Sequence, residues 1–415
     1  MHSSSIGSAA ATGGSRISPG LVFMLAALTA FTPLAIDMYL PALPALAHEF
    51  QAPPATIQLT LSAFFAGIAT GQIFYGALSD RFGRKAPLAT GLALFIVATI
   101  GCAAAGSPEA LIGWRFVQAL GVGATAVIPR AMVRDLFDAR DGARVLSRIM
   151  LVMGLAPILA PIIGAQLLRF GDWRLIFWLL AAFGVLVLAA VLWRLVDSYP
   201  GSSEPLRLGR VLRQHLTLLA DPHMLRYGLG SGVTIGALFA YISGAPFVFI
   251  ERFGLSPQGF TLLFGVNAAG FIALSSLNGA LLGRVSLPAM LRFGVCLQAC
   301  AGLVLLVLGS TGVGGFWGVA VPLFVVMACM GMILPNSTVL CMAPYRHNAG
   351  VASGVLGVMQ YAVAAVTSAL VGALNDGSPR SMVIVVAACT VLGLMLLFRR
   401  PGGAVAAQLA APAAR

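Results

Sequence analysis

The chain has 415 residues, of which 59% are hydrophobic and only 9% are charged. Soluble globular domains carry about 45–50% apolar and about 25% charged residues, so this composition excludes an ordinary soluble protein. The net charge of +12 could attract nucleic acid, but the placement of the charges along the chain argues against that partner.

Apolar stretches of membrane length recur from one end of the chain to the other. A helix needs about 20 apolar residues to cross the hydrocarbon core of a bilayer. Twelve stretches meet this requirement and predict an all-α membrane protein. They cover residues 18–47, 54–76, 87–105, 108–132, 145–168, 173–195, 223–250, 257–281, 287–309, 316–342, 348–371 and 379–398.

The positive charges lie mainly in alternate connections between these stretches. If the N-terminus is cytoplasmic, most of the 25 Lys and Arg residues fall on the cytoplasmic side. This asymmetry is the positive-inside rule of membrane proteins. It predicts a multi-pass membrane protein with both termini in the cytoplasm, and it explains the basic composition without a nucleic acid. The exceptions are Arg115, Arg169, Arg174, Arg252 and Arg380.

The longest polar interruption, residues 196–222, divides the predicted spans into two sets of six. The segment Gly76–Arg81 recurs in the second set as Gly279–Arg284, which indicates a duplicated unit. Since both units enter the membrane from the cytoplasm, we expect a parallel repeat with a substrate site between the halves. The predicted parts are a disordered cytoplasmic N-terminus at 1–17, an N-terminal six-helix half at 18–195, a cytoplasmic linker at 196–222, a C-terminal six-helix half at 223–400 and a disordered cytoplasmic C-terminus at 401–415.

Asp37 is an acidic residue inside the first predicted span. Ionisable groups inside a membrane are costly and are candidates for function. The prolines at 33, 41 and 44 predict a kinked helix whose freed carbonyls face protein or a water-filled cavity. The alternative is an outer interfacial position, because Asp37 lies roughly 27 Å along the helix at 1.5 Å per residue.

Arg115 is a basic residue near the outer end of the fourth predicted span. It could extend to the lipid headgroups, as long cationic side chains do. Gln118 and Gly121 continue a polar, small-residue stripe along the helix, which favours an inward position instead. We expect Asp37 and Arg115 to form an electrostatic couple, since a carboxylate in apolar surroundings beside a cation can load and release protons.

Other polar residues in the spans are candidates for a substrate cavity. The alternative for each is a hydrogen bond between helices. The charged positions show no metal-ligand cluster, nucleophile elbow or phosphate loop, so we predict no enzyme, no cofactor and no metal site. The candidate cavity residues are Tyr39, Gln118, Tyr241, Asn267, Asn336 and Tyr361.

The ten residues Gly76–Lys85, G-A-L-S-D-R-F-G-R-K, form a charged connection between the second and third spans and predict a cytoplasmic hairpin turn. Their pattern resembles the signature loop of the major facilitator superfamily of transporters. The resemblance implies that Asp80 caps the start of span 11, near Asn348–Val351, where a carboxylate is favourable. It also implies that Arg84 pairs with Asp135; the alternative is a solvated loop that only sets topology. The residues of the implied conformational gate are Gly76, Asp80, Arg81, Gly83, Arg84, Lys85 and Asp135.

Three further segments strengthen the resemblance. Residues 115–121 are similar to the span-4 proton-transfer motif, with Arg115 and Gln118 at the matching positions. Residues 154–165 are similar to the span-5 motif of antiporters, although they also suit a kinked helix interface made of small residues. Asp37–Pro44 resembles the span-1 signature of the bicyclomycin and chloramphenicol resistance branch. The matching antiporter positions are Gly154, Pro157, Pro161 and Gly164.

The resemblance implies a major facilitator fold of two pseudo-symmetric halves and a proton-coupled multidrug efflux antiporter. Such a protein exports lipophilic drugs of the chloramphenicol or bicyclomycin kind by alternating access, with drug, protons and lipid as its partners, as a monomer. Thr29 stands where some relatives have a second carboxylate, which disfavours divalent cationic drugs. The alternative is a dedicated proton-coupled exporter or symporter of one metabolite, such as a sugar, an amino acid or a siderophore.

Overall fold

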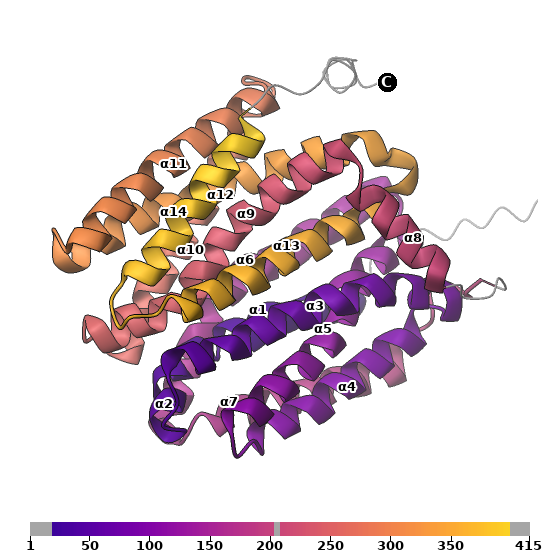
Figure 1. Cartoon of the computed structure of the whole chain (residues 1–415). Coiled ribbons are helices and arrows are strands. Elements are labelled where there is room, and N and C mark those ends of the chain that lie inside the picture. Colours follow the sequence, from indigo (N-terminus) through magenta and orange to yellow (C-terminus); the bar gives the residue numbers. More distant parts are fainter. Residues whose placement is uncertain (1–18, 203–207, 399–415) are drawn as a thin grey trace, which may run out of the picture.

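The computed structural model describes residues 19–202 and 208–398, and every regular element in these ranges is a helix (Figure 1). Twelve helical segments are long and apolar enough to cross a membrane, which confirms the predicted spans and the all-α fold. The elements of the first part are α1 (Pro19–Asp37), η1 (Leu40–Ala42), α2 (Leu43–Glu49), α3 (Pro54–Phe82), α4 (Lys85–Ala103), α5 (Pro108–Leu136), α6 (Ala139–Phe170) and α7 (Arg174–Arg194).

The second part begins with a short helix in the predicted linker and continues with the remaining spans. The predicted termini 1–17 and 401–415 lie outside the described residues. The elements are α8 (Leu208–Leu219), α9 (Pro222–Ala245), η2 (Pro246–Arg252), α10 (Pro257–Leu281), α11 (Leu287–Thr311), α12 (Gly315–Met342), η3 (Ala343–Asn348), α13 (Ala349–Ala373) and α14 (Arg380–Leu397).

Local capping signals explain several of the helix starts. The Ser107 hydroxyl accepts a hydrogen bond from the Ala110 amide at 3.2 Å, directly before α5. The Ser256 hydroxyl accepts one from the Gly259 amide at 3.1 Å before α10. Side chains of this kind satisfy backbone donors that the first helical turn leaves unpaired. In both helices a proline follows the cap, where its missing N–H costs nothing.

The first span is broken, as its prolines predict. The α-helix ends at Asp37, and the chain continues as the 3₁₀ turn η1 and the short helix α2. Pro41 and Pro44 stand in the first turn of these two elements, where a proline is tolerated. The break places Asp37 at a helix end inside the bundle.

The connection predicted at Gly76–Lys85 is present but shorter than ten residues, because α3 continues as a helix to Phe82. Only Gly83 and Arg84 connect α3 to α4. Gly83 has φ +81°, a left-handed conformation that glycine adopts without steric cost. The charged residues therefore lie on helix ends and in a two-residue connection.

The helices pack in two groups. In the first, α3 lies against α5, α4 against α5 and α7, and α1 against α6; in the second, α9 lies against α13 and α14, and α12 against α10 and α11. The groups meet mainly where α13 packs on α3 and α10 on α6. Figure 1 shows the indigo and violet helices α1–α4 in the lower half and the orange α11 at the upper left. The exact division at 18–195 and 223–400 stays a prediction.

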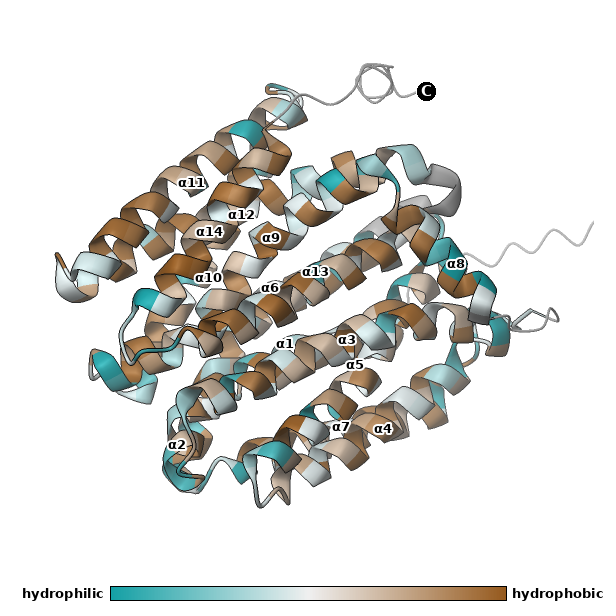
Figure 2. Ribbon diagram, in the orientation of Figure 1, coloured by the Kyte–Doolittle hydropathy of each residue, from teal (hydrophilic) through white to brown (hydrophobic). Residues whose placement is uncertain are grey.

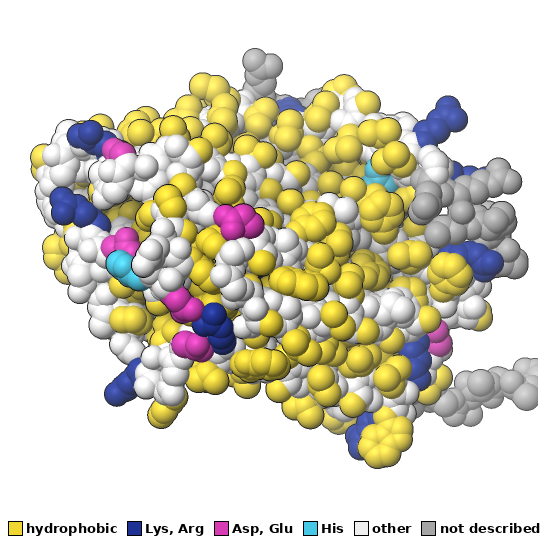
Figure 3. Space-filling view, turned by 60° about the horizontal axis from the view of Figure 1, so that its bottom comes forward, with side chains coloured by type: hydrophobic (Ala, Val, Ile, Leu, Met, Phe, Trp, Pro, Cys, Tyr) yellow, Lys and Arg dark blue, Asp and Glu magenta, His cyan; other side chains and the backbone are white. Residues whose placement is uncertain are grey.

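The outside of the bundle is apolar and suited to lipid. Figure 2 shows hydrophobic residues along the middle of the helices, and Figure 3 shows charged side chains gathered mainly at the two ends. Leu186 on α7 is 71% exposed, and many other large hydrophobic side chains face outward. Soluble proteins rarely expose such surfaces, so the exposed band is the membrane-facing surface. We name the ends inner and outer after the orientation that the charges predict.

Candidate functional site

Asp37 lies at the break in the first span and is buried, with 5% of its surface exposed. None of the ion pairs among the described residues involves it. It interacts electrostatically with Tyr241 on α9 and Tyr361 on α13, which belong to the other group of helices. Asp37 is therefore shielded from solvent, which favours the buried position over the alternative at the outer interface.

Tyr241 is held in place by its own group of helices. The Asn267 side-chain amide donates a hydrogen bond to the Tyr241 hydroxyl oxygen at 3.0 Å. The Tyr241 ring stacks on Phe264, with centroids 5.6 Å apart and an angle of 17° between the rings. These two contacts fix the Tyr241 side chain from within the second group of helices.

Tyr361 is the last of three aromatic side chains that form a row between the two groups of helices. Its ring centroid lies 6.0 Å from that of Phe239 on α9. Phe239 in turn lies 4.3 Å from Phe65 on α3. Tyr361 is only partly buried and also interacts electrostatically with Arg130 on α5. Aromatic and apolar walls with few polar groups are typical of sites for lipophilic small molecules.

Arg115 is fully buried, so the alternative in which it extends to the lipid headgroups is wrong. Its guanidinium donates hydrogen bonds to the Ala35 carbonyl at 3.1 Å and to the Gln118 side-chain oxygen at 2.6 Å. The Phe64 ring centroid lies 4.1 Å from its guanidinium carbon, a cation–π distance. The Arg115 Nε and Nη2 atoms have no hydrogen-bond partner among the described residues.

The expected couple between Asp37 and Arg115 is not formed in this conformation. Arg115 is enclosed within the first group of helices by aromatic side chains from α3 and α7, Phe64 and Phe177. Asp37 instead has its electrostatic partners in the second group. The two side chains therefore lie on different sides of the broken first span. The spacing of the two residues along the sequence could not reveal this separation.

Like Asn267, three others of the six candidate cavity residues form side-chain hydrogen bonds within their own group of helices. Gln118 donates to the Thr99 hydroxyl at 2.8 Å, and Tyr39 shares a 3.1 Å hydrogen bond with the Thr60 hydroxyl. The Asn336 amide donates to the Asn278 oxygen at 2.6 Å. These contacts fit the alternative of hydrogen bonds between helices. Asp37, Tyr241, Asn267 and Tyr361 remain as the candidate site.

Arg84 is the centre of a charged cluster at the inner end, with 7% of its side chain exposed. Its Nε donates to Asp135 at 2.7 Å, which confirms the expected pair, and its Nη1 donates to Asp80 at 2.6 Å and to the Ser79 hydroxyl at 2.9 Å. Burial alone lowers the pKa of Arg84, but the hydrogen bonds to Asp135 and Asp80 more than offset it and raise that pKa above its usual value. The guanidinium is therefore charged, and it ties α3, α4 and α5 together.

Asp80 does not cap span 11 in this conformation. Its side chain is 69% exposed, and its hydrogen bond among the described residues comes from Arg84. The residue that lies against the start of α13 is Arg134 on α5, whose guanidinium is 3.8 Å from the position that a side chain on Gly350 would take. Sequence reasoning missed Arg134, since its charge alone marks it only as part of the positive inner side.

A second residue that the sequence did not single out is Asp197, in the linker. Its carboxylate accepts hydrogen bonds from the backbone amides of Arg84 at 2.8 Å and Lys85 at 3.3 Å. A carboxylate at this place stabilises the N-terminus of α4. Gly83 makes room for it, because a Cβ on Gly83 would collide with Asp197. The linker is further joined to α3, since the Arg81 side chain donates to the Ser202 carbonyl.

The remaining gate positions have simpler surroundings. The Lys85 ammonium donates to the Leu192 carbonyl at 2.9 Å, which links α4 to α7. Gly76 has open space where a side chain would stand, so close packing does not require a glycine there. The conformational role of these positions stays a prediction.

The predicted antiporter segment lies in α6, which runs unbroken through Pro157 and Pro161. Gly164 packs against the backbone of Met38, and a Cβ there would overlap the Met38 carbonyl. Gly154 has far more room, with the Ile272 side chain at 4.0 Å. The segment thus brings α6 close to the first span, directly beside Asp37.

We expect a double-mutant cycle on Arg84 and Asp135 to show strong coupling. Hydrogen bonds to charged groups that are shielded from water contribute about 1.5–3 kcal/mol. The variants Arg84→Ala, Asp135→Asn and their combination are compared by equilibrium unfolding in mixed micelles. The control cycle uses Arg144 and Asp141, an exposed pair at 2.9 Å, where coupling of about 0–1 kcal/mol is expected. Equal coupling in the two cycles would contradict a structural role for the buried pair.

Comparison with known families places these features in context. A family model described as Major Facilitator Superfamily matches residues 25–368. The chain is 33% identical to an uncharacterized MFS-type transporter, YdgK, of Bacillus subtilis strain 168, over 93% of this chain and 96% of that protein. It is 29% identical to a bicyclomycin resistance protein homolog of Haemophilus influenzae strain Rd, over 91% of this chain and 95% of that protein.

Two further likenesses agree with this. The chain is 28% identical to the multidrug resistance protein MdtL of Escherichia coli strain E24377A, over 92% of this chain and 96% of that protein. Its fold is similar to that of the xylose transporter XylE from E. coli in a partially occluded inward-open conformation, with a TM-score of 0.70 and 14% identity. That likeness covers 91% of this chain and 96% of XylE, and it concerns the fold alone.

Proposed function

Because the chain belongs to the Major Facilitator Superfamily of membrane transporters, we propose that it exports lipophilic drugs across the bacterial inner membrane in exchange for protons. The observation that carries this proposal is Asp37, the only acidic side chain that is buried among the described residues. Buried ionisable groups in membrane spans mark ion and proton pathways.

The surroundings of Asp37 support a role in coupling. Its electrostatic partners, Tyr241 and Tyr361, belong to the opposite group of helices. Protonation removes the charge of Asp37 and with it the electrostatic effect of that charge on Tyr241 and Tyr361. A change in charge between the two groups of helices alters the relative stability of two arrangements of the halves. A conformational switch requires such a change.

The proposed cycle follows from this arrangement. With the site open to the cytoplasm, deprotonated Asp37 and the aromatic row admit a lipophilic drug between the halves. The halves then rock, with the inner-end cluster around Arg84 and Asp80 as the conformational gate. With the site open to the outside, Asp37 takes up a proton and the drug leaves.

The energy of one proton is sufficient for export. A proton that moves inward gains about 2.3 kcal/mol per 100 mV of membrane potential. A tenfold concentration ratio costs about 1.4 kcal/mol. One proton per drug therefore sustains a ratio of about 40-fold at that potential.

Two observations support a drug rather than another substrate. The names of two relatives refer to bicyclomycin resistance and to multidrug resistance. The residues between the two groups of helices include the aromatic side chains of Phe65, Phe239 and Tyr361. Phe65 and Phe239 are buried against each other in this conformation, and their apolar surface suits a lipophilic molecule once the halves separate. The single-metabolite alternative predicts a more polar set of contacts.

Transport by the purified chain in proteoliposomes tests the proposal. With the outer side acidic, we expect chloramphenicol and chemically unrelated lipophilic drugs to move outward and to compete with one another. A protonophore removes the gradient and is expected to stop this transport. Competition by one sugar, amino acid or siderophore, without drug movement, would favour the dedicated carrier. Absence of any flux driven by the pH gradient would overturn the proposal.

A further inference from the structure

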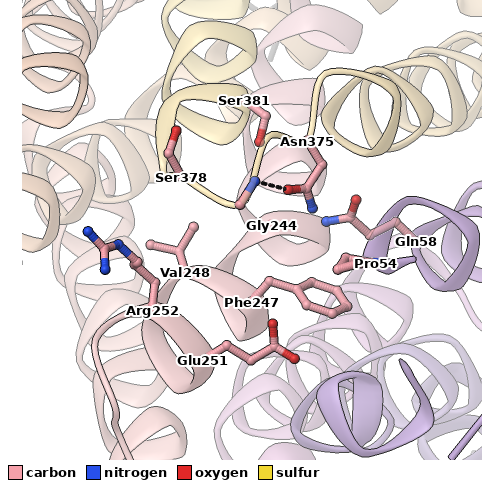
Figure 4. A pocket seen from close by; sticks show the side chains of 11 residues that line it. Pro54, Gln58, Gly244, Phe247, Val248, Glu251, Arg252, Asn375, Ser378 and Ser381 are labelled. Carbon is pink, nitrogen blue, oxygen red and sulfur yellow. Dashed lines mark hydrogen bonds between the residues drawn. The ribbon is translucent and has the colours of Figure 1, made fainter. Parts of the chain in front are cut away.

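A small pocket of about 160 Å³ opens at the outer end of the seam between the two groups of helices. One wall comes from the start of α3, with Pro54 and Gln58. The opposite wall comes from the end of α9, from η2 and from the connection between α13 and α14. Figure 4 shows these side chains around the pocket. The wall residues used below are Phe247, Val248, Asn375, Ser378 and Ser381.

Gln58 provides an unsatisfied hydrogen-bond acceptor in this wall. Gln58 is only 1% exposed. Its amide nitrogen donates a hydrogen bond to the Ser243 carbonyl across the seam at 2.9 Å. Its side-chain oxygen is buried without a hydrogen-bond partner among the described residues. Gly372 leaves room for that oxygen, since a Cβ there would lie 3.1 Å from it. A buried carbonyl of this kind is costly unless a donor reaches it.

Donor groups stand beside this acceptor. The Asn375 side-chain oxygen accepts a hydrogen bond from the Gly377 backbone amide at 2.9 Å. The side-chain nitrogen of Asn375 is therefore the group that can donate to other partners. Figure 4 shows the Asn375 and Gln58 amides pointing toward one another and the Ser381 hydroxyl pointing into the pocket. Phe247 and Val248 supply an apolar wall. The pocket thus combines polar groups with a hydrophobic surface, and the Gln58 oxygen is buried in its wall in this conformation.

The charged groups of the pocket lie at its rim and have opposite signs. Glu251 pairs with His48 at 3.6 Å, across the seam, and Arg252 is exposed. Figure 4 shows both side chains pointing away from the two amides. The interior is therefore uncharged, which favours a neutral polar group over an ion.

We propose that this pocket is an outer subsite that receives an uncharged amide or hydroxyl group of the exported molecule. The inference rests on the proposed export function and adds a chemical class to it. Sites that enclose a whole drug have volumes of about 300–1,000 Å³, so a pocket of about 160 Å³ holds one polar end of the molecule.

The position of the subsite suits a step in release. When the outer end of the seam opens, the hydrogen bond between Gln58 and Ser243 is broken. An amide or hydroxyl of the departing molecule can then donate to Gln58 and accept from Asn375. The substrate replaces contacts that the two halves lose, which lowers the cost of opening toward the outside.

Protection from labelling tests the subsite on the full chain. Ser378→Cys, at the rim, is made in a chain with Cys296→Ala and Cys300→Ala, and right-side-out vesicles are treated with a membrane-impermeant maleimide. The probes are chloramphenicol and N-acetylglycinamide, both uncharged and rich in amide or hydroxyl groups. We expect both probes to slow labelling. Ser381→Ala and Asn375→Asp are expected to weaken this protection about three- to tenfold, the effect of one lost hydrogen bond.

Ser368→Ala is the matched control, because Ser368 is a buried serine on α13 that does not line the pocket. In the Ser368→Ala variant, the two probes are expected to protect the cysteine at position 378 from labelling as well as they do in the parent chain. Failure of both probes to protect, or equal protection in Ser381→Ala, would overturn the subsite even if drug export driven by the pH gradient persists. Protection without such export would instead overturn the export function and leave a pocket that binds uncharged polar groups.

Discussion

Asp37→Asn is expected to abolish efflux driven by a pH gradient while the chain still folds and inserts. Asparagine has nearly the volume of aspartate but cannot carry a proton at this site. The drug ratio that one proton sustains, about 40-fold at 100 mV, is then lost entirely. Folding is preserved because the buried carboxylate has no ion-pair partner among the described residues, and a neutral amide avoids the cost of burying its charge.

Three measurements on Asp37→Asn separate coupling from folding. Drug transport is recorded with and without an imposed pH gradient, and the yield of folded protein is compared with that of the parent chain. Exchange of drug between two equal pools needs no proton and is expected to persist. The control is Asp172→Asn, which removes an exposed outer carboxylate that pairs with Arg174 at 3.2 Å. Full proton-driven efflux by Asp37→Asn would remove Asp37 as the coupling site.

Gly164→Ala and Gly154→Ala are expected to change stability in opposite directions. Both replacements are in α6, and alanine in a helix is favoured over glycine by about 0.8–1.0 kcal/mol. At position 154 the new Cβ meets only the Ile272 side chain, at 4.0 Å. At position 164 it overlaps the Met38 carbonyl, and overpacking of this kind costs about 1–3 kcal/mol or more.

Thermal unfolding in nanodiscs checks this pair of variants. Gly154→Ala is expected to raise the midpoint slightly, and Gly164→Ala to lower it. Since Met38 follows Asp37, displacement of the first span by Gly164→Ala is also expected to reduce proton-driven transport. An equal rise of the midpoint in both variants would mean that α6 and the first span do not approach as closely as the structure has them.

The sequence was sufficient for features that depend on local composition. The twelve spans follow from the length of the apolar stretches, because each helix must satisfy its backbone hydrogen bonds within the bilayer. The break after Asp37 follows from the prolines around it. The pair of Arg84 and Asp135 followed from a motif shared with other transporters, and the structure has it at 2.7 Å.

The sequence was insufficient where the answer depends on how helices rotate against one another. Gln118 and Asn267 are both polar residues in apolar helices, yet Gln118 lies inside one group of helices and Asn267 supports Tyr241 beside Asp37. Asp37 and Arg115 have opposite charges and were expected to pair, but the broken first span separates them. No pattern along the chain distinguishes these cases.

Composition, charge placement and proline positions by themselves thus determined the number of spans, the predicted orientation and the candidate acid Asp37. Tertiary structure alone decided what surrounds that acid, that Gly164 rather than Gly154 is in close contact, and that Asp197 caps α4. The physical reason is that hydrophobic length and backbone constraints act within one helix. The direction of a buried side chain is decided instead by the packing of helices that are distant in sequence.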